Sequence, residues 1–291
     1  MEIVELKPYG YCYGVKKAIE LIKEVRNTHL DKNVYVFGML VHNNDVVKYL
    51  NKLGIITIDI SKIDKIQRLK EFTSDDIVVF TAHGHDKSYE EILKLNNVTF
   101  YDATCKNVEH NLKLIRSLSK ENQIIFIGKK SHPETEASLS ISSNVILYDL
   151  KDKIDYAKVT SLTPYIVNQT TLSFLETKSI HLELLEKYPN AKIVDEICSQ
   201  TRIRQQNIIS TSFNGDLVLI VGSVHSSNTD KLYMLSKDKY KNSKVIKVEN
   251  LEDLKKHNLD GIKSCLITSG TSTPLEAILE IKEYLGGINN E

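Results

Sequence analysis

The chain has 291 residues, of which 41% are hydrophobic and 26% are charged, and this composition suits a globular protein that folds without disulfides. Its 38 basic and 38 acidic residues give no net positive field, which argues against a nucleic acid as a partner. The N-terminal residues lack a basic segment followed by an apolar one, and the longest strongly apolar run covers only residues 217–221. We therefore expect a soluble cytoplasmic protein that does not interact with a membrane.

The chain opens with a short run of strand character at residues 2–6, which leads to Cys12. Apolar residues at helical spacing then predict a helix over residues 15–25. Further runs of strand character follow, at residues 34–38, 55–60 and 76–80. A second amphipathic segment at residues 88–95 closes this part of the chain. Strands that alternate with helices in this way predict a parallel sheet with right-handed helical connections.

The same order of elements recurs twice more. Cys105 and Cys198 each follow a run of strand character, as Cys12 does, and consecutive cysteines of this set are 93 residues apart. Later runs of strand character lie at 124–128, 145–150, 165–168, 217–222, 244–249 and 264–269. We therefore predict an α/β fold of three similar modules with mainly parallel sheets, at residues 14–104, 105–197 and 198–291. Residues 1–13 are then left over, and we assign them to the sheet of the third module.

Loops at the carboxyl ends of parallel strands are the usual binding sites of α/β folds. In a pseudo-threefold arrangement of the modules, these loops would converge on one central cavity and bring Cys12, Cys105 and Cys198 together. Three thiolates suit a [4Fe-4S] cluster in which one iron keeps an open, Lewis-acidic position. Zinc bound by three cysteines is the alternative. A lone cysteine is more often a small buried hydrophobe, which is the role we expect for Cys265.

Nine motifs resemble those of the 4-hydroxy-3-methylbut-2-enyl diphosphate reductases of isoprenoid biosynthesis. In order they are GYCYGVKKAIE, LVHNNDVV, TAHG, FYDATC, SHPETE, NQTTLS, EICSQTRIRQ, GSVHSSNTDKL and SGTSTP. The resemblance spans essentially the whole chain and implies three α/β domains around a [4Fe-4S] cluster bound by Cys12, Cys105 and Cys198. It also implies the last step of the non-mevalonate pathway, a reductive dehydroxylation that gives isopentenyl and dimethylallyl diphosphate.

Three histidines, His42, His83 and His132, lie in loops directly after runs of strand character. A lone loop histidine is more often a surface residue or a cap, but three at related positions favour a shared role as N–H donors to a diphosphate. Hydroxyl and amide side chains add donors, although helix capping is their alternative role. By resemblance, the diphosphate faces His42, His83, Ser226, Asn228 and Ser272, and we add Ser227 as a further donor. The resemblance puts His132 near the hydroxyl end of the substrate.

Glu134, in the motif SHPETE, is the candidate proton donor. Hydroxide is a poor leaving group at neutral pH, so a proton must reach the alcohol oxygen, and a glutamate in a closed cavity can deliver it. From the sequence alone, this role and that of a solvated surface charge are equally favoured. The resemblance assigns proton delivery to Glu134 and a proton relay to Thr170, with Thr171 alongside. We expect Glu136 to be a solvated surface charge.

Electrons must come from another protein, because no GxGxxG motif follows a predicted strand and no flavin signature is found. We expect ferredoxin or flavodoxin, and the basic pair Lys129–Lys130 is a candidate for docking an acidic donor. An iron-sulfur hydro-lyase, which needs no electrons, is the alternative enzyme. A regulatory iron-sulfur sensor is disfavoured, because the neutral chain has no recognisable DNA-binding segment.

The chain departs from the resembled family at three places. Tyr13 stands beside Cys12 where a small residue is common, and KKSHPE lacks the glycine that usually precedes the histidine. The residues CKNV at 105–108 replace the more familiar CPLV. None of these changes removes a predicted cluster ligand or proton donor.

Overall fold

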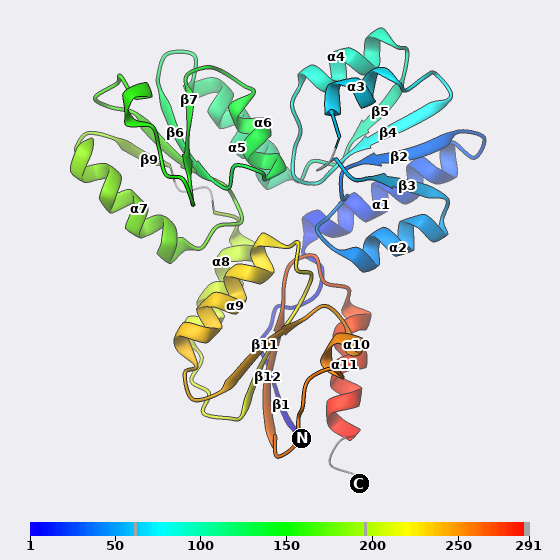
Figure 1. Cartoon of the computed structure of the whole chain (residues 1–291), viewed down its shortest axis with the longest axis vertical. Coiled ribbons are helices and arrows are strands. Elements are labelled where there is room, and N and C mark those ends of the chain that lie inside the picture. The colour runs from blue at the N-terminus through cyan, green and yellow to red at the C-terminus, as the bar shows by residue number, and fades with distance from the viewer. Residues whose placement is uncertain (61–62, 195–196, 288–291) are drawn as a thin grey trace. The chain divides into compact units, whose positions relative to one another are not determined.

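A computed structural model of the chain describes residues 1–60, 63–194 and 197–287. It contains three sheets of four strands, and neighbouring strands of each sheet are parallel (Figure 1). With their helices the sheets form three similar modules, so the predicted α/β class is confirmed. The chain divides into a terminal unit (Met1–Val15, His42–Val46, Ser199–Glu291) and a central unit (Lys16–Val41, Val47–Cys198).

The first sheet of the central unit has the strand order β3-β2-β4-β5. Its strands are β2 (Asn33–Phe37), β3 (Ile55–Ile58), β4 (Asp76–Phe80) and β5 (Thr99–Asp102). All five residues of β4 are buried, as expected for an inner strand of a parallel sheet with helices on both faces. The helices of this part of the chain are α1 (Tyr13–Thr28), α2 (Asn44–Lys52), α3 (Lys65–Lys70) and α4 (Ser88–Leu95).

The second sheet of the central unit repeats this plan in the order β7-β6-β8-β9. Its strands are β6 (Ile124–Gly128), β7 (Val145–Asp149), β8 (Tyr165–Asn168) and β9 (Lys192–Val194). Its helices are α5 (Lys106–Leu118), α6 (Pro133–Leu139), η1 (Tyr156–Lys158) and α7 (Phe174–Lys187). The inner strand β6 is again buried at every residue. In both sheets of the central unit, the loops after the inner strands therefore lie at the carboxyl edge of the sheet. These loops contain polar residues.

The terminal unit contains the third sheet, with the order β1-β12-β10-β11. Its strands are β1 (Glu2–Glu5), β10 (Leu217–Val221), β11 (Lys244–Val248) and β12 (Ser264–Ser269). Its helices are α8 (Ser199–Ser210), α9 (Ser227–Lys239), α10 (Leu251–Leu254) and α11 (Leu275–Gly287). Strand β1 pairs with β12, with Glu2 opposite Ser264, so the first and last strands of the chain are neighbours. The module boundaries themselves stay a prediction.

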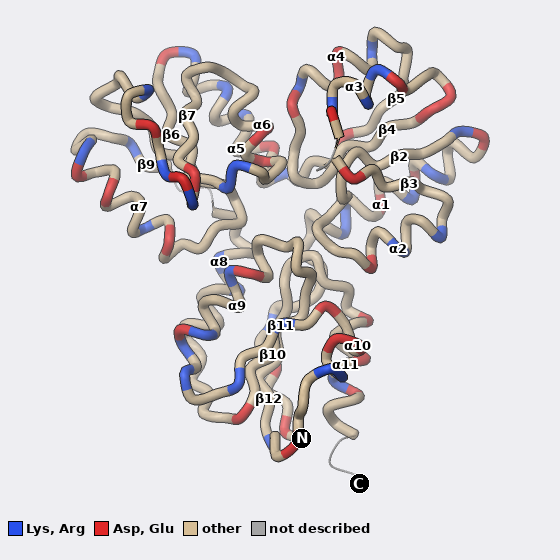
Figure 2. Tube along the Cα trace, viewed as in Figure 1, with Lys and Arg blue, Asp and Glu red and all other residues tan. Residues whose placement is uncertain are grey.

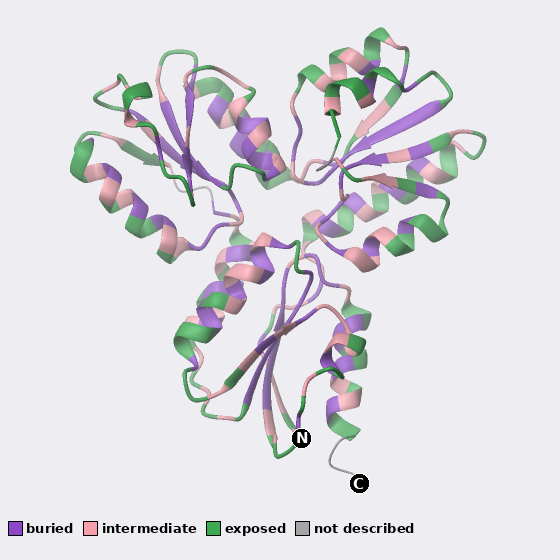
Figure 3. Ribbon diagram, in the orientation of Figure 1, coloured by how far each residue is buried: buried purple, intermediate pink, exposed green. Residues whose placement is uncertain are grey.

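The core of each module lies between its sheet and its helices. Buried residues concentrate in the inner strands and on the helix sides that face the sheets (Figure 3). Cys265 lies fully buried in β12, and burial raises the pKa of its thiol to about 12, so its predicted role as a core residue is confirmed. Basic and acidic residues are interspersed along the elements of both units (Figure 2).

Among the described residues, no helix combines the length and the apolar character that a membrane span requires.

Candidate functional site

The three predicted cluster ligands lie directly before helices. Cys12 precedes α1, Cys105 is the N-cap residue of α5, and Cys198 precedes α8. The free N–H groups and the positive dipole end of a helix N-terminus stabilise a thiolate, which is the form that binds a metal. The three cysteines are partly exposed, whereas Cys265 is buried. These positions therefore suit metal ligands better than core residues.

Two of the three cysteines meet in the central unit. Asn107, in the first turn of α5, donates a hydrogen bond from Nδ2 to Cys198 Sγ at 2.9 Å, so Cys198 lies against the helix that Cys105 caps. The backbone N–H of Cys105 donates to Ala82 O at 3.0 Å, and that of Cys198 donates to Thr170 O at 2.9 Å. Loops that follow strands of both sheets of the central unit thus hold this pair of cysteines through backbone hydrogen bonds.

Cys12 lies in a loop of the terminal unit that the residues after β12 hold. Its N–H donates to Thr271 O at 2.9 Å, and the N–H of Thr271 donates to Asn228 Oδ1 at 3.1 Å. Tyr13, the first residue of α1, is 58% exposed, so its ring is not part of the core. Cys12 is therefore fixed through its backbone while the bulky residue beside it faces solvent.

Arg204 of α8 also holds the loop that contains Cys12. Its side chain is almost completely buried, and Nη1 donates to the backbone oxygens of Ser269 at 2.7 Å and Gly270 at 3.0 Å. Nη2 donates to Gly10 O at 2.7 Å. One guanidinium thus satisfies three backbone carbonyls around the segment that leads to Cys12.

Replacing Arg204 by methionine is expected to lower the free energy of unfolding of the apoprotein by about 3 kcal/mol, because the buried carbonyls lose a charged donor. Urea unfolding followed by circular dichroism measures the change. The control is Arg116→Met, at an exposed position of α5, which should change stability by less than about 0.5 kcal/mol. Equal stability of the two variants would contradict the role of Arg204.

Glu134 lies in the first turn of α6 with its side chain completely buried. Thr170 donates twice to the carboxylate, from N–H to Oε1 at 2.9 Å and from Oγ1 to Oε2 at 2.8 Å. Asn111 Nδ2 donates to Oε1 at 3.2 Å. Burial raises the pKa of Glu134 to about 7, although these donors act in the opposite direction. The alternative of a solvated surface charge is therefore wrong for Glu134, whose carboxyl can exchange a proton near neutral pH.

The end of strand β6 lies very close to the helix that contains Glu134. Strand β6 ends at Gly128, where an added Cβ would lie 2.6 Å from Thr135 Oγ1. A glycine at this position lets the first turn of α6 pack against the end of the strand. Glu136, in the same helix, is partly exposed and pairs with Lys65, so it is a surface carboxylate with a partner.

His132 is the N-cap residue of α6. Its Nδ1 accepts a hydrogen bond from the N–H of Glu134 at 3.2 Å, so in the neutral ring Nε2 carries the proton and is the donor. His83, in the loop after β4, meets His132 edge to face with ring centroids 5.6 Å apart. Two of the three predicted histidines are thus neighbours in the central unit, next to Glu134.

Asn111 is a site residue that the sequence analysis missed. It lies fully buried on α5 among Val108, Leu112 and Ile115, and its Nδ2 donates to Asn168 O at 3.0 Å as well as to Glu134. The sequence does hold a signal for this residue, an asparagine within the apolar stripe of a predicted helix. An amide buried in such a stripe requires hydrogen-bond partners.

Three predicted substrate residues of the terminal unit, Ser226, Ser227 and Asn228, lie at the start of α9. Ser226 Oγ accepts from the N–H of Thr229 at 3.2 Å, which makes it the N-cap of this helix, and Ser227 is the first helical residue. Asn228 is 2% exposed, and its Nδ2 donates to Thr201 Oγ1 at 3.3 Å. Ser226 therefore caps α9. The positive dipole end at the N-terminus of this helix can still favour a bound anion.

Ser272 and His42 are also neighbours within the terminal unit. Ser272 Oγ donates to the backbone oxygen of His42 at 3.1 Å. Asn44, two residues after His42, donates from N–H and from Nδ2 to the carboxylate of Glu249, at 3.1 and 3.0 Å. Contacts among the loops after β2, β11 and β12 therefore position two of the predicted diphosphate donors, His42 and Ser272.

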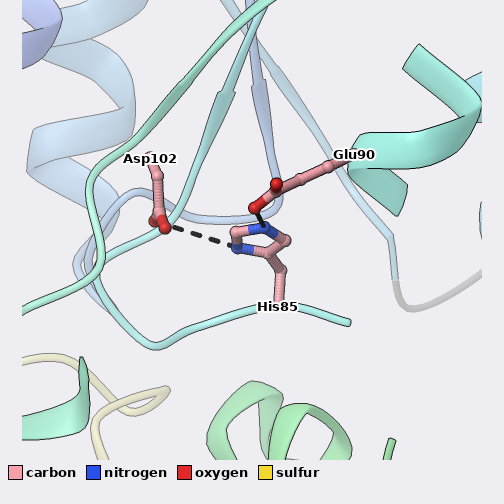
Figure 4. A group of neighbouring side chains, drawn as sticks. All are labelled: His85, Glu90 and Asp102. Atoms are coloured by element: carbon pink, nitrogen blue, oxygen red, sulfur yellow. Dashed lines mark hydrogen bonds and ion pairs between the residues drawn. The ribbon is translucent and has the colours of Figure 1, made fainter. Parts of the chain in front are cut away.

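His85, Glu90 and Asp102 form the one group, within the described ranges, whose ligand atoms lie close enough to hold a metal ion (Figure 4). His85 Nε2 lies 3.1 Å from Glu90 Oε1, and Nδ1 lies 3.8 Å from Asp102 Oδ1. Lys87 forms ion pairs with both carboxylates and already supplies a positive charge. The sequence analysis did not predict this group.

A family model described as LytB protein matches residues 3–286 of the chain. The chain belongs to the LytB family. It is 31% identical to a protein of Halalkalibacterium halodurans over 289 residues, which are 98% of this LytB chain and 90% of the relative. A protein of Bacillus licheniformis is 31% identical over 298 residues, which are 100% of this chain and 92% of the relative. Both relatives are named 4-hydroxy-3-methylbut-2-enyl diphosphate reductase.

Two solved structures are similar to this LytB chain. The E-1-hydroxy-2-methyl-but-2-enyl-4-diphosphate reductase of Plasmodium falciparum has a TM-score of 0.87 and 28% identity, over 99% of this chain and 89% of that one. An (E)-4-hydroxy-3-methyl-but-2-enyl diphosphate reductase, the terminal enzyme of the non-mevalonate pathway, has a TM-score of 0.68 and 26% identity, over 99% and 100%. The family predicted from the nine motifs is therefore confirmed.

Proposed function

We propose that this LytB protein reduces 4-hydroxy-3-methylbut-2-enyl diphosphate to isopentenyl and dimethylallyl diphosphate at a [4Fe-4S] cluster held by Cys12, Cys105 and Cys198. One observation carries the proposal: Thr170 connects the proton donor to a cluster ligand. Its backbone oxygen accepts from the N–H of Cys198, while its own N–H and hydroxyl donate to Glu134. One residue thus contacts both a carboxyl with a pKa of about 7 and the backbone of a cysteine that can bind the cluster.

A [4Fe-4S] cluster fits the residues that would hold it. The donor set consists of three partly exposed cysteines, each of which lies directly before a helix. When bound by three cysteines, the cluster would supply electrons and one open iron that acts as a Lewis acid. Zinc fits the same ligands but has no redox chemistry, so a reductive reaction favours the cluster.

The proposed reaction consumes two electrons and two protons and releases the substrate hydroxyl as water. Glu134 holds the proton that the leaving oxygen requires, and Thr170 Oγ1, in contact with Glu134 Oε2, relays it. Asn111 orients the carboxylate, and the N–H of Glu134 fixes the ring of His132, whose Nε2 can donate to the alcohol end. Because Glu134 is completely buried, bulk water does not compete for its proton.

The diphosphate end of the substrate would bind to N–H, hydroxyl and amide donors. In the central unit the donor is His83; in the terminal unit the donors are His42, Ser226, Ser227, Asn228 and Ser272. The N-terminus of α9 adds a positive dipole end that favours an anion. Neutral donors of this kind bind a diphosphate without a cluster of permanent positive charges.

The electrons would come from a separate protein. We propose ferredoxin or flavodoxin as the donor, since the sequence has no motif for a nicotinamide or flavin cofactor. Lys129 and Lys130 are exposed in the loop after β6, next to the turn that positions Glu134. Their charge makes this loop a candidate contact for an acidic donor.

Anaerobic purification followed by iron, sulfide and product analysis tests the proposal. We expect about four irons and four sulfides per chain. Turnover of 4-hydroxy-3-methylbut-2-enyl diphosphate should require a reductant such as dithionite with a viologen. Product formed equally well without a reductant would identify a hydro-lyase instead, and bound zinc without sulfide would contradict the cluster.

A further inference from the structure

Asn107 makes a contact that the proposed reaction does not use. Its Nδ2 lies 2.9 Å from Cys198 Sγ and donates to the sulfur. Asn107 is the second residue of α5, and Cys105 caps that helix, so one helix terminus carries one predicted ligand and a donor to another. The residue belongs to the stretch CKNV at 105–108, which replaces the more familiar CPLV of the resembled family.

A hydrogen bond to a metal-bound thiolate changes the redox properties of the metal. An N–H donor withdraws electron density from the sulfur, and its stabilising effect grows with the negative charge on the site. Reduction of an iron-sulfur cluster adds one negative charge, so the donor stabilises the reduced form more than the oxidised form. Hydrogen bonds to the sulfurs are accordingly one of the factors that set cluster potentials.

We propose that Asn107 raises the reduction potential of the cluster through its hydrogen bond to Cys198 Sγ, and so makes electron transfer from an external donor more favourable. The inference rests on the proposed function, because it requires a redox cluster bound through Cys198. Asn107 is a tuning residue in this proposal, since it touches the ligand and neither the substrate nor a proton in transfer. The backbone donors of the same helix terminus are common to any sequence, whereas this side chain can be replaced.

The test compares the parent protein with Asn107→Leu, each reconstituted anaerobically and titrated with a redox dye series under electron paramagnetic resonance. Leucine has a similar size but cannot donate. We expect the equilibrium constant for one-electron reduction to fall about tenfold, which corresponds to a potential about 59 mV more negative. Iron and sulfide per chain should stay at the parental value. An unchanged or more positive potential with full iron content would overturn the proposal.

Two further variants make the comparison specific. Asn107→Asp keeps the shape of the side chain but replaces the donor with a negative charge, so its potential should be more negative than that of Asn107→Leu. Asn51→Leu is the matched control: Asn51 is exposed near the C-terminal end of α2, which lies away from the carboxyl ends of the strands. Its potential should equal that of the parent.

Iron content separates this inference from the proposed function. A parent protein that assembles no cluster would contradict the proposed function itself. A parent with a full cluster and an unshifted Asn107→Leu variant would contradict only the role of Asn107. Loss of the cluster in both Asn107→Leu and Asn107→Asp would assign Asn107 to cluster assembly and would likewise overturn the proposed effect on the potential.

Discussion

Replacing Glu134 by glutamine is expected to lower the rate of dehydroxylation about 10²- to 10⁴-fold while the cluster stays bound. Glutamine has the same shape and can keep a hydrogen bond to Thr170, but it has no proton to give to a leaving hydroxyl. Turnover under excess reduced viologen measures the effect. Iron and sulfide analysis of the same sample shows whether the cluster is retained.

The matched control for this variant is Glu136→Gln, two residues further along α6. Glu136 is partly exposed and pairs with Lys65, so its loss should change the rate less than about twofold. Parental turnover in Glu134→Gln would contradict the proposed proton transfer. Equal losses in both variants would point to a general disturbance of α6 rather than to the chemistry of one carboxyl.

The pH profile should reveal the same carboxyl. Burial raises the pKa of Glu134 from 4.5 to about 7, so the folded protein binds this proton more tightly than the unfolded chain does. The resulting stabilisation is complete below pH 4.5 and is lost as the pH rises through about 7. The acid form needed for catalysis disappears over the same range, so turnover should fall about tenfold per pH unit above pH 7. Glu134→Gln should lack this decline.

Replacing Cys198 by alanine is expected to abolish both cluster binding and turnover. Three protein ligands are the minimum for the proposed site, and two cysteines would leave two irons open to solvent and to loss. Alanine also removes the sulfur that accepts from Asn107, while the backbone bond from residue 198 to Thr170 O remains possible. Iron and sulfide per chain after anaerobic reconstitution should fall to less than about a tenth of the parental value.

Cys265→Ala is the control for the loss of a thiol. Cys265 is fully buried in β12 and packs against the core of the terminal unit, so the variant should lose about 1 kcal/mol of stability. It should retain the parental iron content and turnover. Full iron content in Cys198→Ala would contradict its assignment as a ligand, whereas loss of iron in Cys265→Ala would show that metal content follows stability.

The hydrophobic pattern of the sequence predicted most of the buried strands. The inner strands β4, β6 and β10 are buried at every residue, so their composition alone identifies them as strands of parallel sheets. The segment after Cys198 gave a weaker signal, because TRIRQQNIIS is polar; it forms α8, in which Arg204 and Gln205 are buried. Pattern cannot predict this burial, since the partners of Arg204 are backbone carbonyls distant in sequence.

For the site residues, a motif can identify a side chain but not the distant residues that contact it. The motif around Glu134 identified the carboxyl, but its burial depends on Thr170, 36 residues later, and on Asn111 of the preceding helix. The contact of Asn107 with Cys198 joins residues 91 positions apart. Such pairs depend on which loops meet at the carboxyl edges of the two sheets. Hydrophobic pattern reports on each element separately and does not specify which of these loops meet.

The parallel pairing of β1 with β12 has a consequence for biogenesis. Glu2 lies opposite Ser264, so β1 is translated long before the strand with which it pairs. On the ribosome, the sheets of the central unit can close as the nascent chain emerges, whereas the terminal sheet cannot close until β12 has left the exit tunnel. Cys12 follows β1 and bonds to Thr271 beyond β12, so this backbone bond can form only after Thr271 has been translated.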